Sequence, residues 1–514
     1  MDRIPASATP FNLQGRVNAA AHASGHPVID AGRGQPNWTA VAPRAGFFRL
    51  GDFATREAAA ASGNPEWGEM PDPTGIAARL HADLEGDDSP GAVFLAEAVQ
   101  YAVDELGFEP DAWVHELVRA VLGFGYPSPN WMLEHLEKVA ERYLLTFTGS
   151  PIAPTHRFRV FATEGGAAAM TYVFKTLLEN RIVGPGDAVA IATPTFTPYL
   201  QIPVLQSYGF TVVDIGASHN QAYRFDDQVL LKLLDPRIKV FFVINPGNPD
   251  SRAMRPERLE QLRELVETQR PDLLIVVDTA YSTFVENYRG ITAVLPRNVI
   301  VLHSFSKNFA GTGNRVGFLA VPVDSVADEA LAALPDATKD ALRIRYAPVT
   351  PDVENMSFLR RLVADSREVA LHNISGLATP EQVQMTFFEL AFLMPGGNAY
   401  VAATRRELAS RMDALMGALG IAPPGGTDSM YYAIVDVLAV ARSRRGDALA
   451  DRWAAEVDPE IVALTLASDH GVIVQPGASF RSDPWDVRLS LASLTADDAA
   501  AVGRAVVAVV DALV

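Results

Sequence analysis

Residues 299–317 hold the side chains whose types and spacing suit chemistry best. The apolar run from Val299 to Leu302 predicts a short buried strand, and the polar turn after it contains a single lysine, Lys307. Arg315 follows eight residues later, among glycines. A lysine at a strand exit, beside hydroxyl groups and an arginine, suits a lysine that forms a Schiff base next to a bound phosphate group. On this stretch alone, a surface lysine in an ordinary loop is an equally good interpretation.

Two further motifs precede this stretch, each directly after an apolar run. They are Asn245-Pro-Gly-Asn248-Pro and Asp278-Thr-Ala-Tyr281. The order Asn-Pro-x-Asn-Pro, Asp-x-x-Tyr and Ser-x-x-Lys, with an arginine after it, resembles the fold-type I pyridoxal-phosphate enzymes of the class I and II aminotransferase family. Three ordered motifs are a far more specific signal than any one of them.

The resemblance implies that pyridoxal 5'-phosphate is the cofactor and that Lys307 carries it and later moves the Cα proton of the substrate. It implies that Asp278 pairs with the pyridine nitrogen, and that Asn248 and Tyr281 hydrogen-bond the ring oxygen. It also implies that Phe196 stacks on the ring and that Tyr126 reaches a partner subunit's cofactor phosphate. A turn tyrosine on the surface is the alternative for Tyr126, and a core phenylalanine for Phe196.

A phosphate-binding turn is predicted over residues 158–170, where a strand, a glycine turn and the start of a helix follow one another. A helix N-terminus presents unpaired N–H groups to an anion. The family often has a hydroxyl residue at the position of Ala167. The resemblance therefore assigns the phosphate to Gly165, Gly166, Ala167, Ser304, Ser306 and Arg315.

Three arginines are candidates for binding the carboxylates of a substrate. Arg488 lies in an alternating strand with an Arg-x-Ser-x-Ala setting. The resemblance implies a bidentate pair with the substrate α-carboxylate, which Asn248 would also contact. The alternative is a solvent-facing strand arginine. Arg33, between two glycines, is the first candidate for a side-chain carboxylate, and Arg367 is the second.

The composition excludes several classes of protein. The 514 residues are 48% hydrophobic, which is enough for a large core, and carry a net charge of −18, which disfavours nucleic acid as a partner. With no cysteine, the chain can form neither disulfides nor zinc–thiolate sites, and we predict no metal site. A polar N-terminus and the lack of any long apolar run predict no signal peptide and no membrane span, and therefore a cytoplasmic location.

Short apolar runs alternate with helical stretches through the middle of the chain. This pattern indicates an α/β fold with a mostly parallel sheet covered by helices on both faces, plus a smaller α+β domain. Ligands of such sheets bind at the carboxyl ends of strands, where every motif lies. We predict an N-terminal arm with part of the small domain (1–54), a helical insertion (55–110), a large cofactor domain (111–395) and a C-terminal small domain (396–514).

Longer stretches resemble the aspartate 4-decarboxylases within this family. Examples are Ala31-Gly-Arg-Gly-Gln-Pro-Asn-Trp and Thr193-Pro-Thr-Phe-Thr-Pro-Tyr. The resemblance implies β-decarboxylation of L-aspartate or a close analogue to L-alanine, with transamination as a side activity, in a dimer or larger homo-oligomer. The resemblance is weakest at residues 477–486. A plain aminotransferase for an acidic or aromatic amino acid is the alternative. A regulator that binds the cofactor without turnover is a third reading, disfavoured because no basic DNA-binding module is present.

Overall fold

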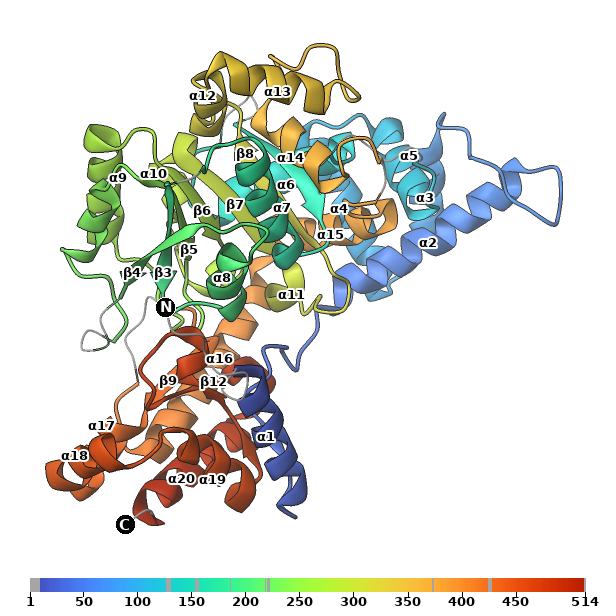
Figure 1. The fold of residues 1–514 in the computed structure, drawn as a ribbon. Coiled ribbons are helices and arrows are strands. Elements are labelled where there is room, and N and C mark those ends of the chain that lie inside the picture. Colours follow the sequence, from blue (N-terminus) through green and yellow to red (C-terminus); the bar gives the residue numbers. More distant parts are fainter. Residues whose placement is uncertain are drawn as a thin grey trace.

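The structure is a computed structural model. Of the 514-residue chain it describes residues 10–125, 131–152, 157–184, 186–217, 219, 222–371, 374–423 and 428–512. A large sheet with helices around it forms one part of the molecule, and a smaller part contains the C-terminus (Figure 1). Tyr126 lies outside the described residues, so its predicted role stays a prediction.

The central sheet contains seven strands in the order β2-β8-β7-β6-β5-β3-β4. Strand β8 runs antiparallel to its neighbours β2 and β7, and the other pairs are parallel. The strands are β2 (Phe158–Thr163), β3 (Ala188–Thr193), β4 (Thr211–Gly216), β5 (Ile238–Ile244), β6 (Leu274–Asp278), β7 (Val299–Ser304) and β8 (Gly317–Pro322). Near-continuous apolar runs such as that of β7 are typical of strands buried on both faces. The predicted α/β class is confirmed.

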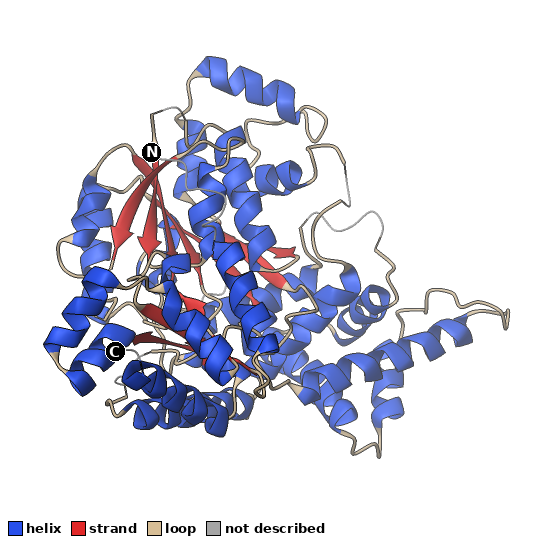
Figure 2. Ribbon diagram, turned by 60° about the horizontal axis from the view of Figure 1, so that its bottom comes forward, coloured by secondary structure: helices blue, strands red, loops and turns tan. Residues whose placement is uncertain are grey.

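Helices cover both faces of this sheet, as Figure 2 shows. Alternate residues of each strand point to opposite faces, so Val276 and Val277 of β6 belong to different hydrophobic clusters. One face packs against α7 (Gly166–Glu179), α12 (Val326–Ala332) and α14 (Phe358–Ser366). The other packs against α6 (Glu134–Phe147), α9 (Pro256–Gln269), α10 (Ile291–Val294) and α15 (Thr379–Leu393). Among the described residues, no helix combines the length and apolarity needed to cross a bilayer.

The smaller part joins both ends of the chain. Its antiparallel sheet has the order β11-β12-β9, formed by Gln475–Pro476, Asp486–Ser490 and Tyr432–Asp436. A separate parallel pair joins β1 (Ile29–Asp30) to β10 (Val472–Ile473). Around these strands lie α1 (Pro10–Ala23), α16 (Asn398–Leu419), α17 (Val437–Arg445), α18 (Asp447–Glu456), α19 (Glu460–His470) and α20 (Ala496–Ala512). The N-terminal arm therefore packs with residues that come more than 400 positions later in the sequence.

A group of four helices, the N-terminal helical group, lies beside the sheet on the right of Figure 1. It contains α2 (Val41–Ala61), α3 (Ile76–Leu84), α4 (Pro90–Leu106) and α5 (Pro110–Val121). The expected domain boundary at 54/55 falls inside the continuous helix α2. In α5, Pro110 takes the first helical position, and Glu109 caps the helix by accepting from two backbone N–H groups. Asp111 accepts the N–H groups of Gly75 and Ala77 at the start of α3.

His303 is a buried titratable group one residue before the end of the strand that leads to Lys307. Its ring nitrogens share hydrogen bonds with the hydroxyl groups of Tyr143 and Thr279, at 3.2 and 3.0 Å. The imidazole packs against the rings of Tyr143, Phe147, Phe305 and Phe318. Burial lowers the pKa of His303 from 6.5 to about 3, so the ring is neutral in the folded chain at neutral pH.

We predict that His303 makes the fold acid-sensitive. Because its pKa is about 3 in the folded chain and about 6.5 in the unfolded chain, only the unfolded chain gains a proton between these values, and stability falls with the pH. The loss at about pH 5 is about 2 kcal/mol. His303→Gln keeps hydrogen-bonding groups but does not titrate. Its unfolding temperature should therefore fall less between about pH 7 and about pH 5 than that of the wild type, and an equally steep fall would contradict the prediction.

Candidate active site

A pocket of about 520 Å³ lies where the carboxyl ends of the sheet strands meet the smaller part of the molecule. Lys307 reaches it from α11 (Phe305–Asn308), the short helix that directly follows β7. Most of the predicted site residues line the same pocket. They are Gly166, Ala167, Phe196, Asn248, Asp278, Tyr281, Ser304, Ser306, Lys307, Arg315 and Arg488. The structure therefore brings together residues from motifs that are far apart in the sequence.

The Lys307 ammonium group lies against the backbone of the N-terminal arm. Its Nζ donates a hydrogen bond of 2.8 Å to the carbonyl oxygen of Gly34, which also accepts from the Tyr431 hydroxyl at 2.9 Å. A Cβ atom on Gly34 would lie 2.9 Å from both Lys307 Nζ and the Tyr432 hydroxyl oxygen. Only glycine fits this approach without displacing the lysine. The lysine is thus aimed into the pocket and has no carboxylate partner among the described residues.

An anion-binding cradle lies at the start of α7. Gly165 is the N-cap with a φ of 92°, and the helix continues for 14 residues from Gly166. The Arg315 guanidinium lies beside it, because Nη1 contacts the Ser306 hydroxyl at 3.4 Å and a Cβ atom on Gly165 would lie 2.7 Å from Nη2. Free N–H groups, two serine hydroxyls and an arginine around one space fit the phosphate of pyridoxal phosphate.

Asp278 ends strand β6 at the floor of the pocket. Its carboxylate accepts hydrogen bonds from the backbone N–H of Ala280 at 3.0 Å and from the Tyr199 hydroxyl at 3.3 Å. Burial raises the pKa of Asp278 to about 6, because the hydrogen bonds and the more distant Lys307 do not fully offset desolvation. A cationic partner such as a protonated pyridine nitrogen would remove this penalty, so the carboxylate fits the predicted cofactor.

Arg488 closes the opposite side of the pocket. Its Nη1 donates to Asn248 Oδ1 at 3.3 Å and its Nη2 donates to the Gly32 carbonyl at 2.6 Å. The guanidinium carbon lies 4.4 Å from the ring centre of Tyr432 and 4.7 Å from that of Phe480. Within the described part of the chain, Arg488 makes no ion pair and its buried Nε has no hydrogen-bond partner. The arginine is held in place but its charge is left for a ligand.

Three hydroxyl and amide groups link the lysine side of the pocket to the arginine side. Tyr281 shares a hydrogen bond of 3.1 Å with Tyr432 and lies 3.4 Å from Asn248 Nδ2. Burial opposes ionisation of the Tyr432 phenol, but the charges of Lys307 and Arg488 outweigh it and lower the pKa of Tyr432. Tyr432, Tyr199 and Gly34 were not predicted as site residues. The contacts of Tyr432 and Gly34 with Lys307 cross from one part of the molecule to the other, and Tyr199 meets Asp278 from a segment 79 residues away.

Two predicted substrate arginines are placed away from this pocket. The turn containing Arg33 wraps around Asp30, whose carboxylate accepts the N–H groups of Gly32 and Arg33. The Arg33 side chain is 64% exposed, folds back onto the same carboxylate at 3.3 Å and lines a different surface pocket. Arg367 is buried beside the Phe161 ring, 5.9 Å from its centre. The role predicted for Arg33 requires its side chain to leave Asp30.

The family model for aminotransferase class I and II matches residues 122–506. The chain is also 38% identical over 517 aligned residues to a Pseudomonas protein called "Bifunctional aspartate aminotransferase and L-aspartate beta-decarboxylase". That alignment covers 99% of this chain and 97% of the relative. The similarity therefore includes the N-terminal arm and the N-terminal helical group, as well as the residues that the family model matches.

Solved structures share the fold at much lower identity. A Thermus thermophilus aspartate aminotransferase mutant aligns with a TM-score of 0.60 at 17% identity, over 99% of this chain and 100% of that one. An aromatic aminotransferase from Pyrococcus horikoshii aligns with a TM-score of 0.59 at 16% identity, over 97% of this chain and 98% of that one. These similarities confirm the predicted fold-type I architecture.

We predict that Asp278→Asn makes the apoprotein more stable but weakens its binding of the cofactor. The pKa of Asp278 is raised to about 6 from 3.8, so the folded chain holds its proton more tightly and stability falls as the pH rises between these values. At about pH 8 the neutral amide should make the apoprotein more stable by about 1 to 3 kcal/mol, and below about pH 4 this gain should vanish.

The same variant should bind pyridoxal phosphate more weakly, because the amide cannot pair ionically with the ring nitrogen. Urea unfolding of the apoprotein at both pH values and a fluorescence titration with the cofactor measure the two effects. Asp88→Asn, at an exposed position before α4, is a control for the same change of side chain. Unchanged cofactor affinity in Asp278→Asn would contradict the role of Asp278.

Proposed function

The chain belongs to the aminotransferase class I and II family, and from this premise we propose that it is a pyridoxal-phosphate enzyme that converts L-aspartate, or a close analogue, to L-alanine and CO2. Transamination of aspartate is the side activity. The main observation in support of the proposal is that Lys307, Asp278 and Arg488 line one pocket, together with residues of the anion-binding cradle. The full-length similarity to the Pseudomonas relative supports the choice of reaction.

When bound, the cofactor would supply an electron sink next to the substrate amino group. The chain's own contribution begins with Lys307, whose Nζ is held 2.8 Å from the Gly34 carbonyl at the inner wall of the pocket. From there the amine takes the proton from the substrate Cα and returns a proton later in the cycle. The Tyr432 hydroxyl, next to Lys307 and Tyr281, keeps the amine oriented for this transfer.

Arg488 binds the substrate α-carboxylate. The Asn248 amide and the Gly32 carbonyl fix the guanidinium plane, and the rings of Tyr432 and Phe480 exclude water from its faces. A planar, preoriented guanidinium pairs with a carboxylate through two parallel hydrogen bonds. The substrate is then held with its Cα facing Lys307.

The β-carboxylate needs a different kind of partner, because it must lose its charge as CO2 leaves and a proton takes its place on Cβ. A tight ion pair would oppose that loss. Among the described residues that line the pocket, the cations are Lys307, Arg315 and Arg488, each already assigned. We therefore keep Arg33 as the candidate: it is flanked by the pocket-lining Gly32 and Gly34, and its present ion pair is exposed and weak.

The same observation favours the second candidate function. If no cation reaches the β-carboxylate, the pocket suits an amino acid without a second carboxylate, and the enzyme is a plain aminotransferase.

The proposal also includes self-association into at least a dimer, because Phe196 is 37% exposed at the mouth of an open pocket and a second subunit would cover it. The absence of cysteine suits a reducing, cytoplasmic location.

We predict that the purified holoenzyme releases alanine and CO2 from L-aspartate in equal amounts, without a keto-acid acceptor. Coupled alanine and CO2 assays with and without 2-oxoglutarate measure this. Lys307→Ala should abolish both products, because no other described lysine lines the pocket. Oxaloacetate that forms only when 2-oxoglutarate is added would instead support the plain aminotransferase.

We further predict that Arg33→Ala lowers decarboxylation more than transamination, by about tenfold in the ratio of the two products, since it removes only the β-carboxylate contact. Arg488→Lys is the matched comparison. It should raise the KM for aspartate in both reactions and leave their ratio unchanged, because the α-carboxylate is common to both. An unchanged ratio in Arg33→Ala would remove Arg33 from the mechanism.

A further inference from the structure

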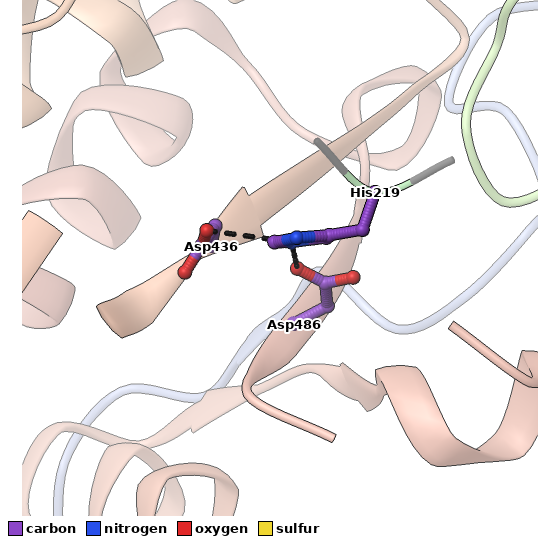
Figure 3. A group of neighbouring side chains, drawn as sticks. All are labelled: His219, Asp436 and Asp486. Atoms are coloured by element: carbon purple, nitrogen blue, oxygen red, sulfur yellow. Dashed lines mark ion pairs between the residues drawn. The ribbon is translucent and has the colours of Figure 1, made fainter. Parts of the chain in front are cut away.

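A second group of chemically reactive side chains lies at one end of the β9–β12 pair and does not line the cofactor pocket. His219, Asp436 and Asp486 point toward one another, as Figure 3 shows. Asp436 and Asp486 are direct cross-strand partners at the end of the β9–β12 pair. His219 comes from the loop after β4, more than 200 residues earlier in the sequence. Two carboxylates placed directly opposite each other repel, so this end of the sheet needs a positive charge.

The separations of these side chains do not suit hydrogen bonds. His219 Nε2 lies 3.3 Å from Asp436 Oδ2 and 3.6 Å from Asp486 Oδ1, beyond the usual range for N–H···O contacts. All three ligand atoms lie within 4.8 Å of one another. Two ligand atoms that each lie about 2.1 Å from a tetrahedral ion are about 3.4 Å apart. The two distances from His219 Nε2 therefore match edges of a tetrahedral coordination shell, and the two carboxylate oxygens lie within 4.8 Å of each other.

The carboxylate of Asp486 gives a second, independent indication of a ligand. Its side chain is only 1% exposed, and Oδ1, which faces His219, has no hydrogen-bond partner among the described residues. The other oxygen, Oδ2, accepts from the Tyr223 hydroxyl. A buried carboxylate oxygen without a partner is costly unless a cation binds it.

Asp436 is oriented in a similar way. Its Oδ1 accepts the backbone N–H of Ala439 at 2.8 Å and so caps α17. Its Oδ2 remains directed at His219. Each carboxylate thus has one oxygen fixed by a neighbouring donor and the other turned into the shared space, which is the arrangement of metal ligands supported by surrounding hydrogen bonds.

We propose that His219, Asp436 and Asp486 form a binding site for a divalent cation of the zinc class. One imidazole nitrogen and two carboxylate oxygens are ligands that Zn²⁺ accepts, whereas Mg²⁺ prefers oxygen ligands alone. The fourth position is open to water. A neighbouring pocket of about 370 Å³ contains the three residues and gives the ion a path from solvent. The side chains of His219 and Asp436 are 36% and 31% exposed.

The bound cation joins the loop after β4 to the strand that carries Arg488. Residues two apart on a strand point to the same face, so Asp486 and Arg488 share one face of β12. Fixing Asp486 therefore restrains the strand from which Arg488 enters the cofactor pocket. The cation site itself does not depend on the proposed reaction.

Isothermal titration of the chelator-treated holoenzyme with ZnCl2 tests the site. We expect one ion per chain, with affinity lowered at least about 100-fold in His219→Ala and in Asp436→Asn. Asparagine is also a good N-cap, so Asp436→Asn should keep α17 intact. His81→Ala, an exposed histidine in α3, should bind Zn²⁺ as the wild type does. Mg²⁺ at equal concentration should not compete.

Anomalous diffraction from crystals soaked in ZnCl2 locates the ion directly. A peak within about 2.2 Å of His219 Nε2 and of both carboxylates would establish the site. Zinc binding that is unchanged in both His219→Ala and Asp436→Asn, or an anomalous peak only elsewhere, would overturn the proposal. Failure of the wild type to bind Zn²⁺ at micromolar concentration would also overturn it, and would leave a loosely packed histidine with two carboxylates.

Discussion

The cofactor pocket contains charged side chains that form no ion pair with one another or with any other described residue, and the rest of the structure depends on this. Within the described ranges, Lys307 donates to the Gly34 carbonyl, Arg488 donates to a carbonyl and an amide, and Asp278 accepts from a backbone N–H and a tyrosine hydroxyl. Desolvated charges cost free energy unless a ligand pairs with them. A zwitterionic cofactor and an amino-acid substrate supply the missing partners. Binding energy is therefore concentrated where the chemistry takes place.

Both parts of the molecule contribute charged side chains to the pocket and hold them in place. The parallel sheet delivers Asp278 and Lys307 at the ends of neighbouring strands, because carboxyl ends of parallel strands meet at one edge. The smaller part contributes Arg488 and Tyr432 from an antiparallel pair. The N-terminal arm lies between them, where the carbonyls of Gly32 and Gly34 accept from Arg488 and Lys307 respectively. Any movement of the smaller part would change both sides of the pocket together.

Local patterns were enough to predict the sheet and the class of fold, because continuous apolar runs mark the buried strands. Most pocket residues were predicted from the family resemblance, which the motifs around Asn248, Asp278 and Lys307 carry. Contacts between distant segments could not be predicted in this way. Tyr432 faces Lys307 only because the smaller part folds over the sheet edge, and Arg33 turns away because Asp30 organises its loop. The expected absence of a metal site rested on missing cysteines, whereas His219, Asp436 and Asp486 meet only in three dimensions. Nothing in their spacing marks them.

The central claim is that Lys307 is the residue that carries the cofactor. Borohydride reduction of the holoenzyme, followed by protease digestion and mass spectrometry, tests it most directly, since reduction makes the link between the cofactor and its lysine permanent. The account predicts a phosphopyridoxyl group on the peptide that contains Lys307 and on no other lysine. The label on a different lysine, or an unlabelled protein that still holds the cofactor, would contradict the account.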